Sequence, residues 1–236
     1  MKKHTERGIN MKIKVKELNP GDRFGYGMKS AIVLDKMDDG VLCMVVDENY
    51  QIEFDRNNNN NFAESTLRTE LNVHYMRQWI DEGANPRDFV EMEVDLTADD
   101  GLDDYGTCKC YLAPRTCDQH RKYRKLIPNC DNWEWTATPF STKSNDYSID
   151  VRAADTDGSI INADVDDTLW VRPLFKLKPD AEVEVEISKY KYYPEKSCSL
   201  DESIKSLINQ YGTADFLEAF SKILVEEFNR KKEKQS

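Results

Sequence analysis

The chain has 236 residues, of which 44 are acidic and 33 are basic, and its formal net charge is −11. This length fits one large domain, or a domain with an appendage, and the 39% hydrophobic content is enough for a packed core. The negative charge argues against free nucleic acid and anionic membranes as direct partners. No apolar run reaches the roughly 18 residues of a membrane span, and no apolar segment follows the charged N-terminus, so no secretory signal is predicted.

The first part of the ordered chain is predicted to be a small antiparallel sheet. Residues 1–10 are polar and are interpreted as a leader, and residues 12–16 then alternate in the way of a strand. Residues 31–35 and 41–46 are apolar and predict two strands, and the Asp-Asp-Gly turn between them predicts a hairpin.

The next stretch mixes loop and helix signals. Residues 57–61 are five consecutive asparagines, which predict a flexible, solvated loop. Ser65 is predicted to be the N-cap of a helix that ends at Gly83, and the alternating residues 89–96 predict a strand. An acidic, turn-rich loop over residues 99–106 follows.

Residues 118–126 predict a short helix that is basic, against the sign of the whole chain. Two interpretations stay open for its Arg and Lys side chains. They balance nearby acids on a solvated face, or they form a docking patch for an acidic group.

The segment from Trp133 to Leu177 is bounded by two aromatic–proline stretches around a polar, turn-rich span. Two interpretations stay open for the tryptophans: Trp133, Trp135 and Trp170 all pack in the core, or one indole of the pair Trp133 and Trp135 lies in the core and the other points outward. Arg172 is predicted to be a buried structural arginine paired with a carboxylate. The residues predicted to support this segment are Trp133, Trp135, Pro139, Trp170, Arg172 and Pro173.

Several motifs, taken together in their order, resemble a known family over about residues 11–180. They are residues 65–68 with 71–72, 95–97 with 100–106, 123–125 with 127–128, 133–139, 157–159 and 171–174. The chain resembles a family of Gram-positive bacterial and phage proteins whose domain of unknown function is related to the formylglycine-generating-enzyme and C-type-lectin-like folds.

The resemblance implies an α+β domain with a twisted antiparallel sheet and long irregular loops. It also implies that the segment between the two aromatic–proline stretches supplies the ligand face. Formylglycine-generating enzymes use a cysteine pair and a metal near the end of the domain, but this chain has no cysteine between Cys130 and Cys198, which argues against that chemistry.

The loops of residues 143–169 are therefore the predicted recognition face, with a solvated loop that binds nothing as the open alternative. An exposed Trp135 or Tyr147 would be its natural anchor. The candidate ligand-binding or partner-binding residues are Lys143, Asn145, Tyr147, Asp155, Asp157, Asn162, Asp164 and Asp166.

No catalytic constellation is predicted, and no cofactor. The three histidines are scattered, and neither a nucleophile elbow nor a phosphate-binding glycine loop is present. The six cysteines are interpreted as reduced thiols. A zinc site of Cys108, Cys110, Cys117 and Cys130, with His120 as a substitute, is the disfavoured alternative because the spacing lacks the usual pairs.

The C-terminal region predicts an appendage. Residues 11–187 form the predicted domain, 188–199 a linker and 200–236 two amphipathic helices. Such helices cannot bury an apolar face alone, so a homo-oligomer is predicted. The residues expected to hold it together are Leu217, Phe220, Leu224 and Phe228.

Three functional hypotheses follow. The leading one is a non-enzymatic binding module, encoded by a phage or mobile element, that recognises a ligand or a protein in the cytoplasm of a bacterial host. The second is an acidic inhibitor of a host defence protein that mimics nucleic acid for a basic groove. The third is an enzyme of unknown chemistry.

Overall fold

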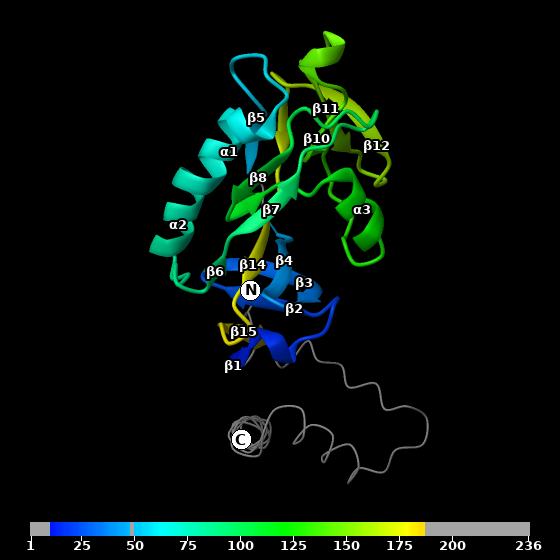
Figure 1. Ribbon diagram of the computed structural model, residues 1–236. Coiled ribbons are helices and arrows are strands. Elements are labelled where there is room, and N and C mark those ends of the chain that lie inside the picture. Colours follow the sequence, from blue (N-terminus) through cyan, green and yellow to red (C-terminus); the bar gives the residue numbers. More distant parts are fainter. Residues whose placement is uncertain (1–9, 48–49, 187–236) are drawn as a thin grey trace, which may run out of the picture. The chain divides into compact units, whose positions relative to one another are not determined.

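The computed structural model describes residues 10–47 and 50–186 (Figure 1). The chain divides into two units, one of residues 14–181 and one of residues 1–13 with 182–236. The predicted linker, the C-terminal helices with Leu217, Phe220, Leu224 and Phe228, and nearly all of the leader lie outside the described residues. In the second unit, strands β1 (Asn10–Lys14) and β15 (Glu182–Glu186) are paired.

The larger unit is an α+β fold built mostly from antiparallel strands, as predicted. Its first sheet has the order β2-β3-β4-β14-β6, and β9 also pairs with β14. The bounds are β2 Arg23–Tyr26, β3 Lys29–Met37, β4 Gly40–Val45, β6 Phe89–Val90, β9 Leu112–Ala113 and β14 Leu174–Leu177. The predicted hairpin is β3–β4, and it turns at Asp38 and Asp39, which confirms that prediction.

A second sheet has the order β12-β11-β10-β13-β5, and a two-stranded ladder joins β7 to β8. The bounds are β5 Gln51–Glu53, β7 Met92–Asp95, β8 Thr107–Cys110, β10 Glu134–Pro139, β11 Asp150–Ala154, β12 Ile160–Asp164 and β13 Thr168–Trp170. The two aromatic–proline stretches meet in this sheet, because Glu134 of β10 lies opposite Trp170 of β13 in a parallel pairing.

One continuous helical run crosses the larger unit. It comprises α1 (Thr66–Thr69), a π-helical segment (Glu70–Tyr75) and α2 (Met76–Asp81). Ser65 caps it by accepting a hydrogen bond from the Arg68 N–H, and Gly83 follows its end with a φ of 103°, so both predicted ends are confirmed. In Figure 1 this run and α3 (Cys117–Tyr123) lie to the two sides of β7 and β8.

Short 3-10 turns complete the helical elements described. They are η1 (Val15–Glu17), η2 (Phe62–Glu64) and η4 (Lys143–Asn145). None of the helices in the described ranges is long and apolar enough to cross a membrane.

Trp79 of α2 is the centre of the aromatic core. Its side chain is fully buried, its indole N–H donates to the Tyr26 carbonyl over 2.8 Å, and its ring meets the edge of Phe175 at 4.8 Å between centroids. Gly27 has a φ of 60°, and a Cβ there would lie 3.0 Å from the indole. The backbone of the Tyr26–Gly27 turn therefore lies close to this tryptophan, and glycine leaves room for the indole.

Two predictions about loops are wrong. The asparagine run is not solvated throughout: Asn60 is completely buried, and its side-chain amide donates to the carbonyls of Ser141 and Asp150. Residues 143–169 are also not loops alone, because β11, β12 and the start of β13 lie in the segment. Backbone pairing in the hairpin β11–β12 orders a stretch whose polar side chains suggested irregular structure.

Candidate functional site

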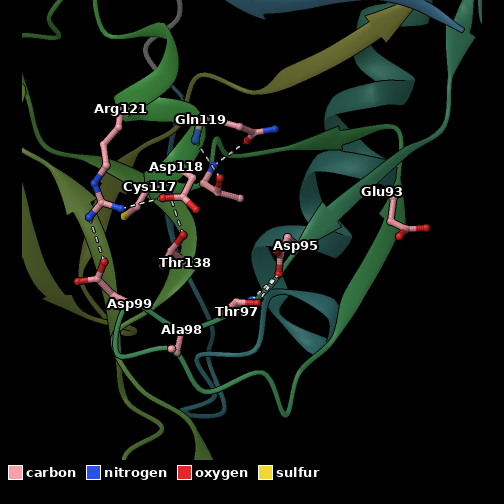
Figure 2. A pocket seen from close by; sticks show the side chains of 12 residues that line it. Glu93, Asp95, Thr97, Ala98, Asp99, Cys117, Asp118, Gln119, Arg121 and Thr138 are labelled. Carbon is pink, nitrogen blue, oxygen red and sulfur yellow. Dashed lines mark hydrogen bonds and ion pairs between the residues drawn. The ribbon is translucent and has the colours of Figure 1, made fainter. Parts of the chain in front are cut away.

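An acidic pocket of about 380 Å³ opens between β7, the loop that follows it, the start of α3 and β10 (Figure 2). Its lining residues are Glu93, Asp95, Thr97, Ala98, Asp99, Gly101, Thr116, Cys117, Asp118, Gln119, Arg121 and Thr138. Figure 2 shows Arg121 with Asp99 on one side of the pocket, and Asp95 and Glu93 of β7 on the other. Most of these side chains are polar, so the pocket suits a hydrophilic ligand.

The α3 wall is held by local hydrogen bonds. Thr116 and Gln119 form a capping box, in which each side chain accepts a hydrogen bond from the backbone N–H of the other residue. The next N–H, of Cys117, donates to the Thr138 hydroxyl of β10 over 3.0 Å. These bonds fix the start of the helix against the second sheet.

The loop after β7 forms the opposite wall. Asp95 accepts two hydrogen bonds from Thr97, at 2.9 Å from its N–H and at 2.6 Å from its hydroxyl. The Asp99 N–H donates to the Pro139 carbonyl over 3.0 Å, which ties the loop to the end of β10. Gly101 has a φ of 92°, which L side chains rarely adopt, so glycine suits this tight turn.

Asp99 is the one pocket carboxylate held between two guanidinium groups. Arg121 lies 3.1 Å from one of its oxygens and Arg152 lies 2.6 Å from the other. Burial opposes ionisation of Asp99, but the hydrogen bonds and charges of Arg121 and Arg152 outweigh it and lower its pKa. Arg121 also binds Asp118 at 2.9 Å, so its charge is already shared by two carboxylates.

The remaining acids keep unused acceptor oxygens. Glu93 and Asp95 are exposed residues, and within the described parts of the chain no Lys or Arg forms an ion pair with either. The pocket lining contains four carboxylates but only one guanidinium, that of Arg121. This excess of negative charge gives the pocket a negative potential. An ammonium or guanidinium group of a ligand is the chemistry that this arrangement favours.

The rim of the pocket continues into the predicted recognition segment. Ser141 donates to Asp100 over 2.6 Å, and the hydroxyls of Thr142 and Ser144 donate to Asp104. The acidic loop is also bonded to the asparagine run, because the Tyr105 hydroxyl donates to the side-chain oxygen of buried Asn60 over 2.8 Å. The acidic loop of residues 99–106 and the η4 loop therefore form one connected surface.

The candidate ligand residues fall into two groups. Lys143 and Asn145 lie in η4, with Tyr147 just after it, while Asn162 and Asp164 lie on β12 and Asp166 in the turn beyond. Asp164 is directly opposite Asp150, whose hydrogen bond and charge raise the pKa of Asp164.

Asp155 and Asp157 lie apart from the others, in the turn at the far end of the β11–β12 hairpin. There Asp157 accepts from the Ser159 N–H at 2.7 Å, and its own carbonyl accepts from Arg124. The structure therefore brings six of the eight candidates toward one end of the hairpin and leaves these two at the other.

The predicted supporting residues are largely structural. Trp135 is 1% exposed and donates to the Ile52 carbonyl over 2.8 Å, while Trp133 is 43% exposed. One indole is thus inside and one outside, which agrees with the second of the two interpretations and not with core packing of all three tryptophans. Strand alternation is not the reason, because residues two apart share a face; Trp133 simply precedes the first residue of β10.

The buried Trp135 cannot be the exposed anchor that was considered, whereas Tyr147 is 38% exposed. Pro139 and Pro173 are buried, and Trp170 is half-buried. Pro139 ends β10 and Trp170 ends β13 of the second sheet, and Pro173 directly precedes β14 of the first.

Arg172 is buried and paired with Glu134, which confirms the predicted structural role. It donates twice to this carboxylate, at 2.6 Å through one terminal nitrogen, and the equally buried Arg115 donates to it at 3.0 Å. Burial opposes ionisation of Glu134, but both arginines outweigh it and lower the pKa of the carboxyl.

His120 completes this buried group. The Arg115 Nε–H donates to His120 Nδ1 over 2.9 Å, so the imidazole proton lies on Nε2 and is donated to the Gly158 carbonyl at 2.9 Å. Sequence reasoning missed Arg115, Glu134 and the role of His120. Glu134 between two tryptophans was the available signal, since a charged residue inside an apolar strand needs a partner.

The two interpretations of the basic helix are now distinguished for most of its cations. Arg121 binds Asp99 and Asp118, and Lys122 binds Asp35 at 2.8 Å. Arg124 donates to Asn129 and to the Asp157 carbonyl. Arg121 and Lys122 thus balance nearby acids, which favours the first interpretation for these two, whereas Arg124 binds neutral acceptors.

The five described cysteines are free, buried thiols: Cys43, Cys108, Cys110, Cys117 and Cys130. Among the residues that the structure describes, no three His, Cys, Asp or Glu side chains gather as metal ligands would. Burial raises the pKa of the Cys43 and Cys117 thiols.

Comparison with protein-family models, with curated proteins and with solved structures finds no match to this chain.

Proposed function

We propose that this chain is a non-enzymatic binding module that receives a cationic group of a protein partner in the acidic pocket. The observation that carries the proposal is a concave site lined by four carboxylates and one guanidinium, in which Glu93 and Asp95 have no cationic partner among the described residues. A Lys or Arg side chain of a partner supplies the charge and the donors that these oxygens lack.

The surface beside the pocket supplies the rest of the contact. Tyr147 is 38% exposed, its ring packs on Phe140 at 5.2 Å between centroids, and its hydroxyl donates to Asp150 over 2.7 Å. Ile149 is also exposed, at 48%. A rigid aromatic with an apolar neighbour is a typical anchor at an interface. The proposed recognition face thus combines the pocket with the η4 loop.

The wider setting is part of the same proposal. The lectin-like resemblance supports a binding role, because in that family the segment between the two aromatic–proline stretches supplies the ligand face. We place the module in the cytoplasm of a bacterial host as a phage or mobile-element protein, which the free thiols support.

Removal of single charges tests the proposal. A fluorescein-labelled tetra-arginine peptide, followed by fluorescence anisotropy at low salt, is expected to bind the intact protein. Asp95→Asn and Glu93→Gln should each weaken binding by roughly tenfold, because each removes a carboxylate that is near the bound cation. Asn at position 95 still accepts from Thr97, so the loop keeps its shape.

Asp103→Asn is the matched control, because Asp103 is an exposed acid outside the pocket lining. It changes the net charge equally and should leave binding unchanged. If all three variants weaken binding alike, recognition rests on bulk charge. That result would contradict the pocket proposal. It would favour the acidic-inhibitor hypothesis, in which many surface carboxylates act together.

A further inference from the structure

Cys108 and Cys110 lie on one face of β8, away from the acidic pocket. Residues two apart in a strand point to the same side, and both cysteines are buried while Thr107 and Lys109 are exposed. The ladder with β7 places Cys108 opposite Val94 and Cys110 opposite Met92. The dithiol therefore sits on the inner face of the β7–β8 ladder.

Arg68 of α1 covers the first of these thiols. Its Nε lies 3.1 Å from the Cys108 sulfur, and a terminal nitrogen donates to the Lys109 carbonyl at 3.3 Å. No carboxylate in the described part of the chain forms an ion pair with this guanidinium. The Cys108 sulfur is therefore the group that can supply a negative charge to Arg68.

The π-helical segment fixes Arg68 at this place. The Asn72 amide donates to the Arg68 carbonyl at 3.0 Å and to the Leu112 carbonyl at 2.8 Å. Its oxygen accepts from the N–H groups of Tyr111 and Leu112. One side chain thus joins the helix to the chain just after β8, and π-helical segments often occur at functional sites.

The electrostatics of the two thiols differ. The hydrogen bond from Cys110 and the charge of Arg68 outweigh burial and lower the pKa of Cys108 to about 6. The same contact with Cys108, together with burial, raises the pKa of Cys110. These opposite shifts favour the thiolate on Cys108 and the protonated thiol on Cys110, and the Arg68 guanidinium 3.1 Å from the Cys108 sulfur is placed to stabilise that thiolate.

We propose that Cys108 is a peroxide-sensitive thiolate and that Cys110 is its resolving thiol. The Cys108 sulfur attacks one oxygen of a hydroperoxide, so an S–O bond forms, the O–O bond breaks, and the alkoxide or hydroxide that leaves takes a proton from solvent. The sulfur is oxidised by two electrons to a sulfenic acid, and the peroxide is reduced.

In the second step the Cys110 sulfur attacks the Cys108 sulfur. The S–S bond forms, the S–O bond breaks, and the hydroxide leaves as water with the proton of Cys110. Strand geometry places Cα atoms two residues apart at about 6.6 Å, near the upper end of the range that a disulfide spans. The side chains on one face of a strand are nearly parallel, so the two Cβ atoms are also about 6.6 Å apart, beyond the roughly 3.8 Å of a disulfide. The bond therefore forms only when residues 108–110 leave the strand conformation of β8.

Arg68 is one of the side chains that cover Cys108. The cysteine is 4% exposed, but Arg68 above it is partly exposed to solvent. A small hydroperoxide reaches the sulfur only when the Arg68 guanidinium rotates away from it. A fully buried thiol such as Cys43, which is 0% exposed, has no such path.

The test is site-resolved thiol chemistry on the full chain. Iodoacetamide at about pH 6.5, followed by peptide mass spectrometry, should alkylate Cys108 at least about tenfold faster than Cys43, Cys117 or Cys130. Arg68→Met should slow the Cys108 reaction by a similar factor. Slow alkylation of the other three thiols in each variant reports that the fold is retained.

Hydrogen peroxide distinguishes the two cysteines. One equivalent should convert the wild-type protein to a Cys108–Cys110 disulfide. Cys110→Ser, or Cys110→Ala if the serine variant unfolds, should stop at a sulfenic acid that dimedone traps on Cys108. The proposal would be overturned if wild-type Cys108 were alkylated no faster than Cys117. It would also be overturned if dimedone labelled other described cysteines and not Cys108.

Discussion

Arg172 donates two hydrogen bonds to the Glu134 carboxylate, and this pair joins the start of β10 to the segment that leads into β14. Both side chains are at least 96% buried, and Arg115 binds the same carboxylate from a third part of the chain. A single anion thus compensates two cations inside the protein. Such a group is costly to break, because the partner left behind stays buried and charged.

Glu134→Gln is expected to lower the free energy of unfolding by about 3–5 kcal/mol, because two buried guanidinium groups lose their counter-charge. Urea unfolding followed by circular dichroism measures the change. Glu93→Gln is the control, since Glu93 is exposed and has no ion-pair partner in the described chain, and its effect should stay within about 0.5 kcal/mol. Equal effects of the two variants would contradict the structural role of Glu134.

His120 should make stability depend on pH. Burial and the charge of Arg115 lower its pKa in the folded protein, and Arg124 adds to this while Glu134 and the Gly158 carbonyl oppose it. The unfolded chain therefore takes up the proton first, so the contribution of neutral His120 is complete above about pH 6.5 and is lost as the pH falls.

The measurement is the melting temperature of the wild-type protein and of His120→Asn between about pH 7 and about pH 5. Asn keeps an acceptor for Arg115 but does not titrate. The wild-type protein should lose stability more steeply than the variant over this window. Parallel curves would show that His120 does not bind a proton on unfolding.

Trp135→Ala and Trp133→Ala form a matched pair two residues apart. Trp135 is buried and donates to the Ile52 carbonyl, so its removal should cost about 3–5 kcal/mol. Trp133 is 43% exposed, and its removal should cost far less, within about 1 kcal/mol. Thermal melts of both variants measure the two losses of stability. A larger loss for Trp133→Ala than for Trp135→Ala would contradict the burial of Trp135.

The asparagine run offers a second matched pair. Asn60→Ala removes an amide that donates to two carbonyls and accepts from Tyr105, so it should destabilise by about 1–3 kcal/mol. Asn57 is exposed, and Asn57→Ala should be near neutral. Chemical denaturation of the two variants measures the difference, and a neutral Asn60→Ala would mean that water replaces the amide.

The sequence by itself determined the elements whose signals are local. The hairpin β3–β4 follows from two apolar runs around an Asp-Asp-Gly turn, and the helical run follows from the Ser65 cap and the Gly83 end. These features depend on backbone conformations that the residues themselves favour. The buried role of Arg172 was also predictable, because its apolar, strand-like setting requires a partner.

Only the tertiary structure decided which distant residues became partners. Nothing local in the sequence joins Asn60 to Ser141, Arg115 to Glu134 or Arg68 to Cys108, because each contact is made by segments far apart in the chain. The acidic pocket arises in the same way, where β7 and its loop meet α3 and β10. Local patterns report periodicity and turns, whereas burial and charge pairing depend on how packing brings the elements together.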